Sequence, residues 1–246
     1  MKKNYLFTIA LILFTLITTK AQLTDNQSKE NNILAIAQNI EWFGQSAIKI
    51  VANNKVIYID PYKLSADDKA DIILITHAHG DHLSVADIKK INNPKTVIYA
   101  PADCCKKLND AGFNNCKPIA PNSNIEIVGI QILAVAAYNT NKDYHPKTNN
   151  WVGYVLTIND VKIYHPGDTQ RIPEMKEINC DIAFMPLGQT YTMTNVEEAV
   201  NAILDTKAKI AIPFHYGMYE GSNNDALMFK KLLEGKVIVV LKEYKQ

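Results

Sequence analysis

The chain has 246 residues, of which 47% are hydrophobic and 21% are charged, and its net charge is +1. This length and composition exclude a disordered chain and are enough for one full hydrophobic core. The 26 Lys and Arg residues are balanced by 25 Asp and Glu residues, so we expect no nucleic-acid partner.

The first 21 residues have the pattern of a signal peptide. Two lysines precede an uncharged apolar run from Tyr5 to Thr19, and Thr19-Lys-Ala21 matches the small-x-small pattern of a cleavage site. The run is short for a membrane span. We therefore expect cleavage after Ala21 and a periplasmic or secreted protein without a stable membrane span. An uncleaved N-terminal anchor is the alternative.

Residues 22–38 are rich in Gln, Asn, Ser and Lys, which predicts a flexible lead-in before a domain over residues 39–246. In that domain, short runs rich in Val, Ile and Tyr alternate with helical patterns, which predicts a layered α/β domain. The expected strands are Ile40–Phe43, Ala47–Ala52, Lys55–Ile59, Ile72–Ile75, Thr96–Tyr99, Ile125–Val128, Ile130–Val135, Val152–Ile158, Val161–Tyr164, Ile182–Met185, Ile210–Ile212 and Val237–Leu241. The expected helices are Val85–Ile91, Ala102–Ala111, Val196–Leu204, with Thr194 and Glu197 as a capping box, and Asn224–Leu233.

The four cysteines have no zinc-ribbon spacing. Export would permit a disulfide, for example between Cys116 and either Cys104 or Cys105. Four buried thiols, Cys180 among them, fit the sequence equally well.

Five of the six histidines follow predicted strands, where ligands and catalytic groups gather in α/β proteins. Only His145 stands apart, in a polar loop. The densest segment is Thr76-His-Ala-His-Gly-Asp-His82, with three imidazoles and one carboxylate within six residues. In a loop that bends at Gly80, His77 and His79 can turn to one ion while Asp81 and His82 turn to a second. Zinc accepts both kinds of ligand.

An H-x-H-x-D-H segment directly after a strand resembles the signature of the metallo-β-lactamase fold superfamily. The resemblance covers roughly residues 39–241. Within the superfamily, the chain is similar to the metal-dependent hydrolase branch that includes the ascorbate-phosphate lactonase-like proteins. It implies a four-layer αββα sandwich of two mixed β-sheets flanked by helices. The further segments that carry it are Gly44-Gln45-Ser46, Asp60-Pro61, Ile163-Tyr-His-Pro-Gly-Asp-Thr169, Met185-Pro-Leu-Gly188, Tyr191-Thr-Met193 and Ile212-Pro-Phe-His-Tyr-Gly217.

The resemblance implies a ligand set for two metals. His77 and His79 would bind the first ion, Asp168 would bridge both ions, and the second ion would be bound by Asp81, His82 and His215. The third ligand of the first ion is either His145 or Asn139, and we favour His145 because a neutral imidazole is the better zinc ligand.

Other residues are expected around the ligands. Asp60 would accept the outer N–H of a metal-bound histidine or simply form an Asp-Pro turn. We expect His165 to line the site or pack beneath it, without binding metal. The resemblance also places Tyr191 and Tyr216 in segments that would line the site.

The ligand set implies a hydrolase with two zinc ions, with Mn²⁺ or Fe²⁺ as alternatives. A metal-bound hydroxide would attack an ester, lactone, amide or phosphodiester of a small molecule, with Asp81 and Asp168 as the catalytic carboxylates. The alternative is a non-catalytic protein that binds metal and a ligand. The sequence leaves the substrate and the oligomeric state open.

Overall fold

The computed structural model describes residues 27–65, 68–127 and 129–245, so the predicted signal peptide and residues 22–26 lie outside the described residues. The chain separates into two units, Met1–Gln38 and Asn39–Gln246. Residues 27–39 form a helix, in place of the flexible lead-in that we predicted there. Ile33 and Ala37 of this helix are buried and four residues apart, a helical spacing that is hard to recognise in a segment rich in Gln, Asn and Ser. No helix within the described ranges is long and apolar enough to cross a membrane.

The first sheet has six strands in the order β1-β2-β3-β4-β5-β6. The first three strands pair antiparallel, and β3 to β6 pair parallel. Because the parallel strands end at the same edge, loops that follow them are brought together there. The strands are β1 (Glu41–Trp42), β2 (Ile48–Ala52), β3 (Lys55–Ile59), β4 (Ile72–Leu74), β5 (Val97–Ala100) and β6 (Cys116–Pro118).

The second sheet has seven strands in the order β13-β12-β11-β10-β9-β8-β7. It is also mixed, because β7 to β10 pair antiparallel and β10 to β13 pair parallel. The Tyr154 hydroxyl of β9 donates to the Ile75 carbonyl at 2.7 Å and so links the two sheets. The strands are β7 (Asn124–Ile127), β8 (Ile130–Ala136), β9 (Val152–Ile158), β10 (Val161–His165), β11 (Ile182–Pro186), β12 (Ile210–Phe214) and β13 (Ile238–Val239).

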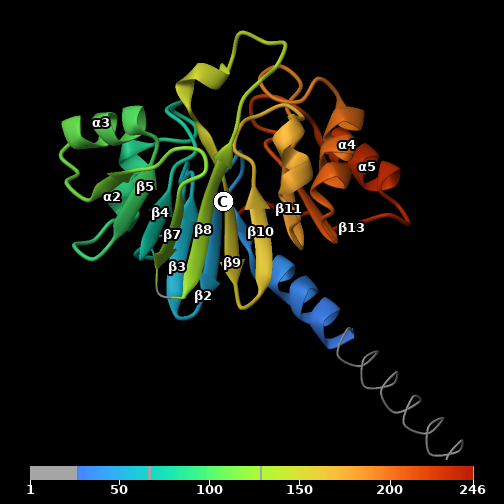
Figure 1. The fold of residues 1–246 in the computed structure, drawn as a ribbon, viewed down its shortest axis with the longest axis horizontal. Coiled ribbons are helices and arrows are strands. Elements are labelled where there is room, and N and C mark those ends of the chain that lie inside the picture. Colours follow the sequence, from blue (N-terminus) through green and yellow to red (C-terminus); the bar gives the residue numbers. More distant parts are fainter. Residues whose placement is uncertain (1–26, 66–67, 128, 246) are drawn as a thin grey trace, which may run out of the picture. The chain divides into compact units, whose positions relative to one another are not determined.

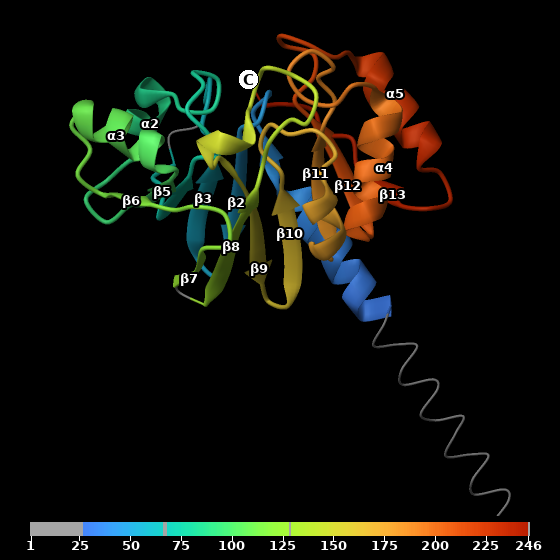
Figure 2. The ribbon, with the colours of Figure 1, turned by 45° about the horizontal axis from the view of Figure 1, so that its top comes forward.

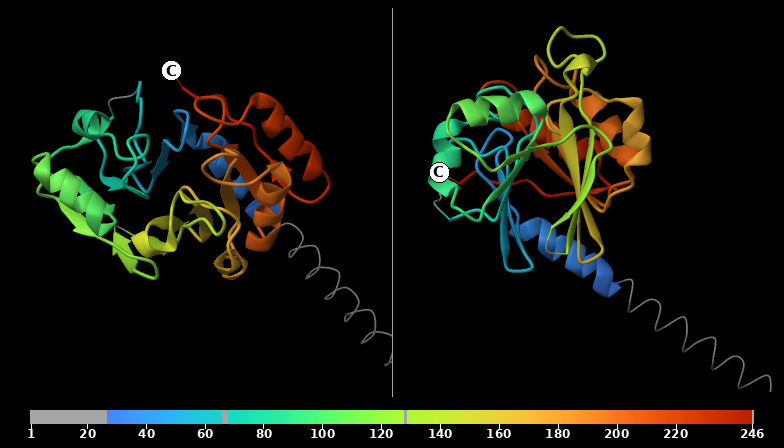
Figure 3. Two further views of the ribbon diagram at one scale, coloured as in Figure 1. Left: turned by 90° about the horizontal axis from the view of Figure 1, so that it is seen from above. Right: turned by 60° about the vertical axis from the view of Figure 1, so that its left-hand side comes forward.

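Helices form the two outer layers of the domain (Figure 2). On the first sheet, α2 (Val85–Ile91) and α3 (Ala102–Asp110) contribute Ile88 and Leu108 to a buried core with Ile73 of β4. On the second sheet, α4 (Val196–Thr206) packs on β11 and on α5 (Asn223–Leu232). Seen from above, the helix pairs lie on opposite sides of the strands (Figure 3). This arrangement confirms the predicted αββα sandwich of two mixed sheets.

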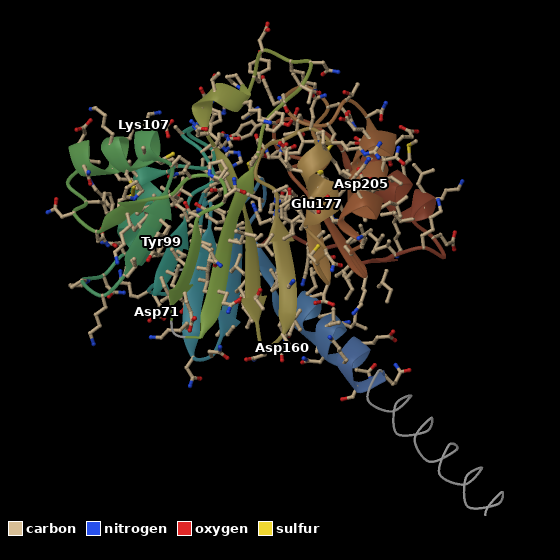
Figure 4. The ribbon with its side chains drawn as sticks, in the orientation of Figure 1. Asp71, Tyr99, Lys107, Asp160, Glu177 and Asp205 are labelled. Atoms are coloured by element: carbon tan, nitrogen blue, oxygen red, sulfur yellow. A yellow bond between two sulfur atoms is a disulfide. The ribbon has the colours of Figure 1, made fainter. Side chains whose placement is uncertain are left out.

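Long loops gather at one edge of the sandwich. The loop after β8 carries the short 3-10 helix η1 (Lys147–Asn149), which lies at the top of Figure 1. A second 3-10 helix, η2 (Pro173–Glu177), lies in the connection that follows β10. Lys107 of α3 lies toward this edge and donates from Nζ to the Ala78 carbonyl at 3.0 Å, whereas Asp160 in the β9–β10 hairpin lies at the opposite end (Figure 4).

Three local features differ from or refine the sequence predictions. The short strand β6 was missed, because Cys-Lys-Pro has no apolar run and pairs only as an edge strand. The cap of α4 is Asn195, one residue after the predicted Thr194, and its side chain accepts from the Glu198 amide. Cys105 and Cys116 form a disulfide between α3 and β6, which resolves the alternatives, while Cys104 and Cys180 are free and buried.

Candidate metal centre

The densest ligand segment leaves the buried strand β4 and turns toward α2. Leu83 N and His82 N both donate to the His79 carbonyl, at 2.8 and 3.1 Å, so the loop folds back on itself directly after Gly80. This turn lets one short segment present side chains in two directions. His77 and His79 therefore belong to one candidate ligand group and His82 to another, while His77 and His82 also form a cluster with Asp168.

The first group contains His77, His79 and His145. His79 Nδ1 lies 3.1 Å from His77 Nε2 and 3.2 Å from His145 Nε2. The polar loop after β8 thus brings His145 to the two strand-end histidines. It does so with a left-handed backbone at His145, whose φ is +56°.

Asn139, the alternative to His145, has a different environment. Its amide nitrogen donates to the carbonyls of Tyr144 and Tyr191, at 2.9 and 2.8 Å. The Tyr191 carbonyl also lies 3.1 Å from His145 Nδ1. A proton on Nδ1 can be donated to that carbonyl, which leaves the lone pair of Nε2 free to bind a metal. Asn139 is therefore a support for the loop that presents His145.

The second group contains Asp81, His82 and His215. His82 Nε2 lies 3.6 Å from Asp81 Oδ2, and His215 comes from the residue directly after β12. The three side chains come from two distant segments of the chain. They meet because β4 and β12 both end at the edge where the loops gather.

Asp168 lies between the two groups. Its Oδ1 is 3.3 Å from His82 Nε2 and 3.1 Å from His215 Nε2. Its Oδ2 is 3.4 Å from His145 Nε2 and 3.9 Å from His77 Nε2. Each carboxylate oxygen therefore faces one group, which is the arrangement of a bridging ligand.

The two ligand groups differ in their electrostatics, because burial lowers the histidine pKa values of the first group, whereas in the second group the Asp168 carboxylate outweighs burial and raises the pKa values of His82 and His215. Burial lowers the pKa of His145 to about 4 and lowers that of His77 well below its usual value, so both rings are neutral at pH 7, the form that ligates metals. Burial would also lower the pKa of His215, but the Asp168 carboxylate raises it to about 9. Among the described residues, His82 Nε2 and Asp168 Oδ1 are buried polar atoms that, although 3.3 Å apart, are not aligned for a hydrogen bond with each other or with another group. A divalent cation would satisfy both atoms.

Asp60 supports ligands of both groups. Its Oδ2 lies 2.7 Å from His82 Nδ1 and accepts the Thr76 hydroxyl at 2.6 Å. That hydroxyl oxygen lies 3.0 Å from His77 Nδ1. Of the two interpretations of Asp60, the structure therefore agrees with the one in which its carboxylate contacts the outer nitrogen of a histidine, here His82 Nδ1.

Sequence reasoning missed several supporting residues. Gln45 is buried, and its Nε2 lies 2.9 Å from Asp81 Oδ2 and 2.8 Å from His215 Nε2. Glu220 Oε1 lies 3.0 Å from His215 Nδ1, and a side chain at Gly188 would overlap this carboxylate. The Trp151 ring packs 4.9 Å from the His77 ring. Gln45 and Gly188 stand in segments that carried the resemblance, which was the only available signal.

Three further predicted residues have distinct positions. His165 packs against Phe184 and Phe214, with Nε2 3.1 Å from the Ser46 carbonyl, so it lies apart from the ligand groups. Tyr191 lines the cavity over the centre. Tyr216 does not, contrary to the prediction. Its ring instead packs at a tilt against Trp42, with ring centroids 5.2 Å apart, and both residues line a neighbouring cavity. The left-handed backbone at His215, with φ +59°, turns the chain so that the next side chain points elsewhere.

The comparisons with known proteins agree with this geometry. The family model of the β-lactamase superfamily domain matches residues 39–215. The chain belongs to the β-lactamase superfamily. A protein from Thermococcus onnurineus (strain NA1) is 32% identical over 219 residues, 82% of this chain and 95% of its own. One from Bacillus thuringiensis (strain Al Hakam) is 32% identical over 221 residues, 81% and 96% of the two chains. Both are named metal-dependent hydrolase.

A solved structure supports the superfamily assignment. The crystal structure of a protein from Parabacteroides distasonis ATCC 8503 has a TM-score of 0.74 and 35% identity to this chain, and the match covers 84% of this chain and 93% of that one. The match thus agrees with membership of the β-lactamase superfamily.

Because Asp60 supports a histidine in each ligand group, we expect Asp60→Asn to weaken metal binding by this superfamily member by roughly 10–100-fold. An amide has one oxygen where the carboxylate has two, and its NH₂ cannot accept from His82 or Thr76. Competition titration with a chromophoric chelator measures the change. Asp110→Asn is the control, because Asp110 pairs with Lys106 on the surface of α3. Unchanged affinity in a folded Asp60→Asn variant would contradict the role of Asp60.

Proposed function

We propose that this chain is a dinuclear zinc hydrolase that cleaves an ester, lactone, amide or phosphodiester bond of a small molecule. The position of Asp168 carries the proposal, because one oxygen faces the His77, His79 and His145 group and the other faces the Asp81, His82 and His215 group. Imidazole nitrogens and carboxylate oxygens are ligands that zinc accepts, while Mn²⁺ and Fe²⁺ are the alternatives.

The metal ions and the residues of the chain would have different roles in the proposed hydrolysis. Zinc ions bound there would act as Lewis acids and make water a nucleophile at neutral pH. The residues of the chain hold the donor atoms in place and exclude bulk water from one side, since His77, His82, Asp168 and His215 are all buried. Asp81 is only partly buried and receives a hydrogen bond from Gln45, so its carboxylate is placed to orient the attacking water or to take up its proton.

We further propose that the mature protein is exported and begins at Gln22. The signal-peptide pattern motivates this, and the Cys105–Cys116 disulfide is a feature typical of oxidising compartments. N-terminal sequencing of the protein from fractionated cells tests the proposal. An intact Met1 on protein from the cytoplasmic fraction would refute it.

Metal analysis together with activity assays tests the hydrolase. We expect close to two zinc equivalents per chain and loss of ester, lactone or phosphodiester hydrolysis after chelation, with recovery when zinc is added back. Full activity in chelated protein would contradict the proposal. Two bound ions without turnover of any of these bond types would favour the alternative, a non-catalytic metal-binding protein.

A further inference from the structure

A cavity of about 620 Å³ opens over the metal centre. This volume is within the range of small-molecule sites. Besides ligand residues such as His79, Asp81 and His215, the cavity is lined by four tyrosines, none of which belongs to the predicted metal ligands. These are Tyr62, Tyr144, Tyr191 and Tyr219.

The four tyrosines form two pairs that differ in what their rings already contact. The hydroxyls of Tyr62 and Tyr219 hydrogen-bond to each other, and Lys63 Nζ lies 5.3 and 5.2 Å from the two ring centroids. The faces of this pair are thus engaged in cation–π contact. The Tyr144 and Tyr191 rings meet edge to face with centroids 4.8 Å apart, and they are 48% and 37% exposed.

The loops that carry Tyr144 and Tyr191 are tied together. Asn139 donates to the carbonyls of both residues. Lys142 Nζ donates to the Gln189 and Thr192 carbonyls at 2.7 and 2.6 Å, which joins the loop after β8 to the loop before α4. The pair is therefore a preformed wall beside His145, and little ordering is needed to bind a ring against it.

The charges of the cavity disfavour a free phosphate group away from the metals. No Lys or Arg is among the described residues that line it, and both lining carboxylates, Asp81 and Asp168, belong to the metal centre. The nearby cations are already used, since Lys63 covers two rings and Lys142 binds backbone carbonyls. Phosphate groups are normally held by such cations.

We propose that the substrate is an uncharged carboxylic ester or lactone whose acyl part carries a planar aromatic ring, and that this ring packs on Tyr144 and Tyr191. The inference rests on the proposed hydrolase function. Hydrolysis consumes one water: the acyl C–O bond breaks, the acyl carbon receives the hydroxyl, and the departing alkoxide oxygen receives the proton.

Three trifluoroethyl esters with the same leaving group test this on zinc-loaded protein: phenylacetate, cyclohexylacetate and acetate. We expect kcat/KM for the phenylacetyl ester to exceed that for the cyclohexylacetyl ester by about two- to tenfold, the range of an aromatic pair beyond its buried area. It should exceed that for the acetyl ester by at least about tenfold. Tyr144→Ala should bring the first ratio close to one with metal content unchanged, and Tyr144→Phe should preserve it. Tyr244→Ala, on a tyrosine of similar exposure in the neighbouring cavity, is the matched control.

Binding of the products phenylacetate and cyclohexylacetate, measured by calorimetry, separates the two proposals. Tighter Tyr144-dependent binding of phenylacetate without hydrolysis of any ester would overturn the hydrolase and leave the aromatic site standing. Equal hydrolysis of phenylacetyl and cyclohexylacetyl esters, or faster hydrolysis of bis(4-nitrophenyl) phosphate than of every ester, would overturn the aromatic carboxylic-ester substrate while the hydrolase stands.

Discussion

Replacing His145 by Ala should lower the bound zinc from about two equivalents to about one and reduce kcat/KM by roughly 100-fold or more. His145 is the third nitrogen donor of the group that contains His77 and His79, and its Nε2 also lies 3.4 Å from Asp168 Oδ2. Without it, that group has two imidazoles and a shared carboxylate. Elemental analysis after dialysis against metal-free buffer measures the retained zinc.

Asn139→Ala is the matched variant for this experiment, because Asn139 belongs to the same loop and contacts the same Tyr191 carbonyl. Its removal takes away loop support and no donor nitrogen, so we expect both zinc equivalents to remain and activity to fall far less. Loss of one ion from Asn139→Ala, with retention of both in His145→Ala, would reverse the assignment.

Asp168→Asn should have the largest effect of any conservative change in the centre, with activity lower by a factor on the order of 1,000. The carboxylate presents one oxygen to each ligand group. An amide presents one oxygen and one NH₂, so one group would face N–H donors instead of a ligand. Zinc content and kcat/KM measured on the same preparation report both consequences.

The control for Asp168→Asn is Asp205→Asn, since Asp205 forms a surface ion pair with Arg171 away from the centre. We expect two zinc equivalents and unchanged activity in that variant. An Asp168→Asn protein that retained both ions and its activity would show that Asp168 does not bridge two metal ions. That result would contradict the proposal of a dinuclear centre.

Much of the fold could be predicted because its strands are short buried apolar runs. Lys55–Ile59 and Val152–Ile158 were predicted with the bounds that the structure has, and both runs end at a polar residue, Asp60 and Asn159. The strand β6 could not be predicted, because Cys116–Pro118 becomes a strand only by pairing with β5. Its formation depends on tertiary contacts that no local pattern records.

Some residues of the candidate centre could likewise be predicted from the sequence, and others could not. Residues of the Thr76–His82 segment were predictable because the ligands are close together in sequence directly after a strand. Glu220 and Trp151 were not, because they act through side-chain contacts with His215 and His77 that only the packed loops create. The alternatives for His145 stayed open for the same reason, since the course of a polar loop is set by bonds such as that from Asn139 to the Tyr191 carbonyl.

The left-handed backbone at the centre limits how this protein could be engineered for thermostability. Gln45, Asp60, His145 and His215 all have φ between +46° and +59°, a region in which residues with a side chain are strained. Glycine would relieve that strain, but all four side chains are buried, and removal of the Asp60 carboxylate would leave the Thr76 hydroxyl without its acceptor. Each such change would delete a side chain of the metal centre. A stabilised variant that is still expected to hydrolyse its substrate must therefore gain its stability elsewhere, for example in the helices of the outer layers.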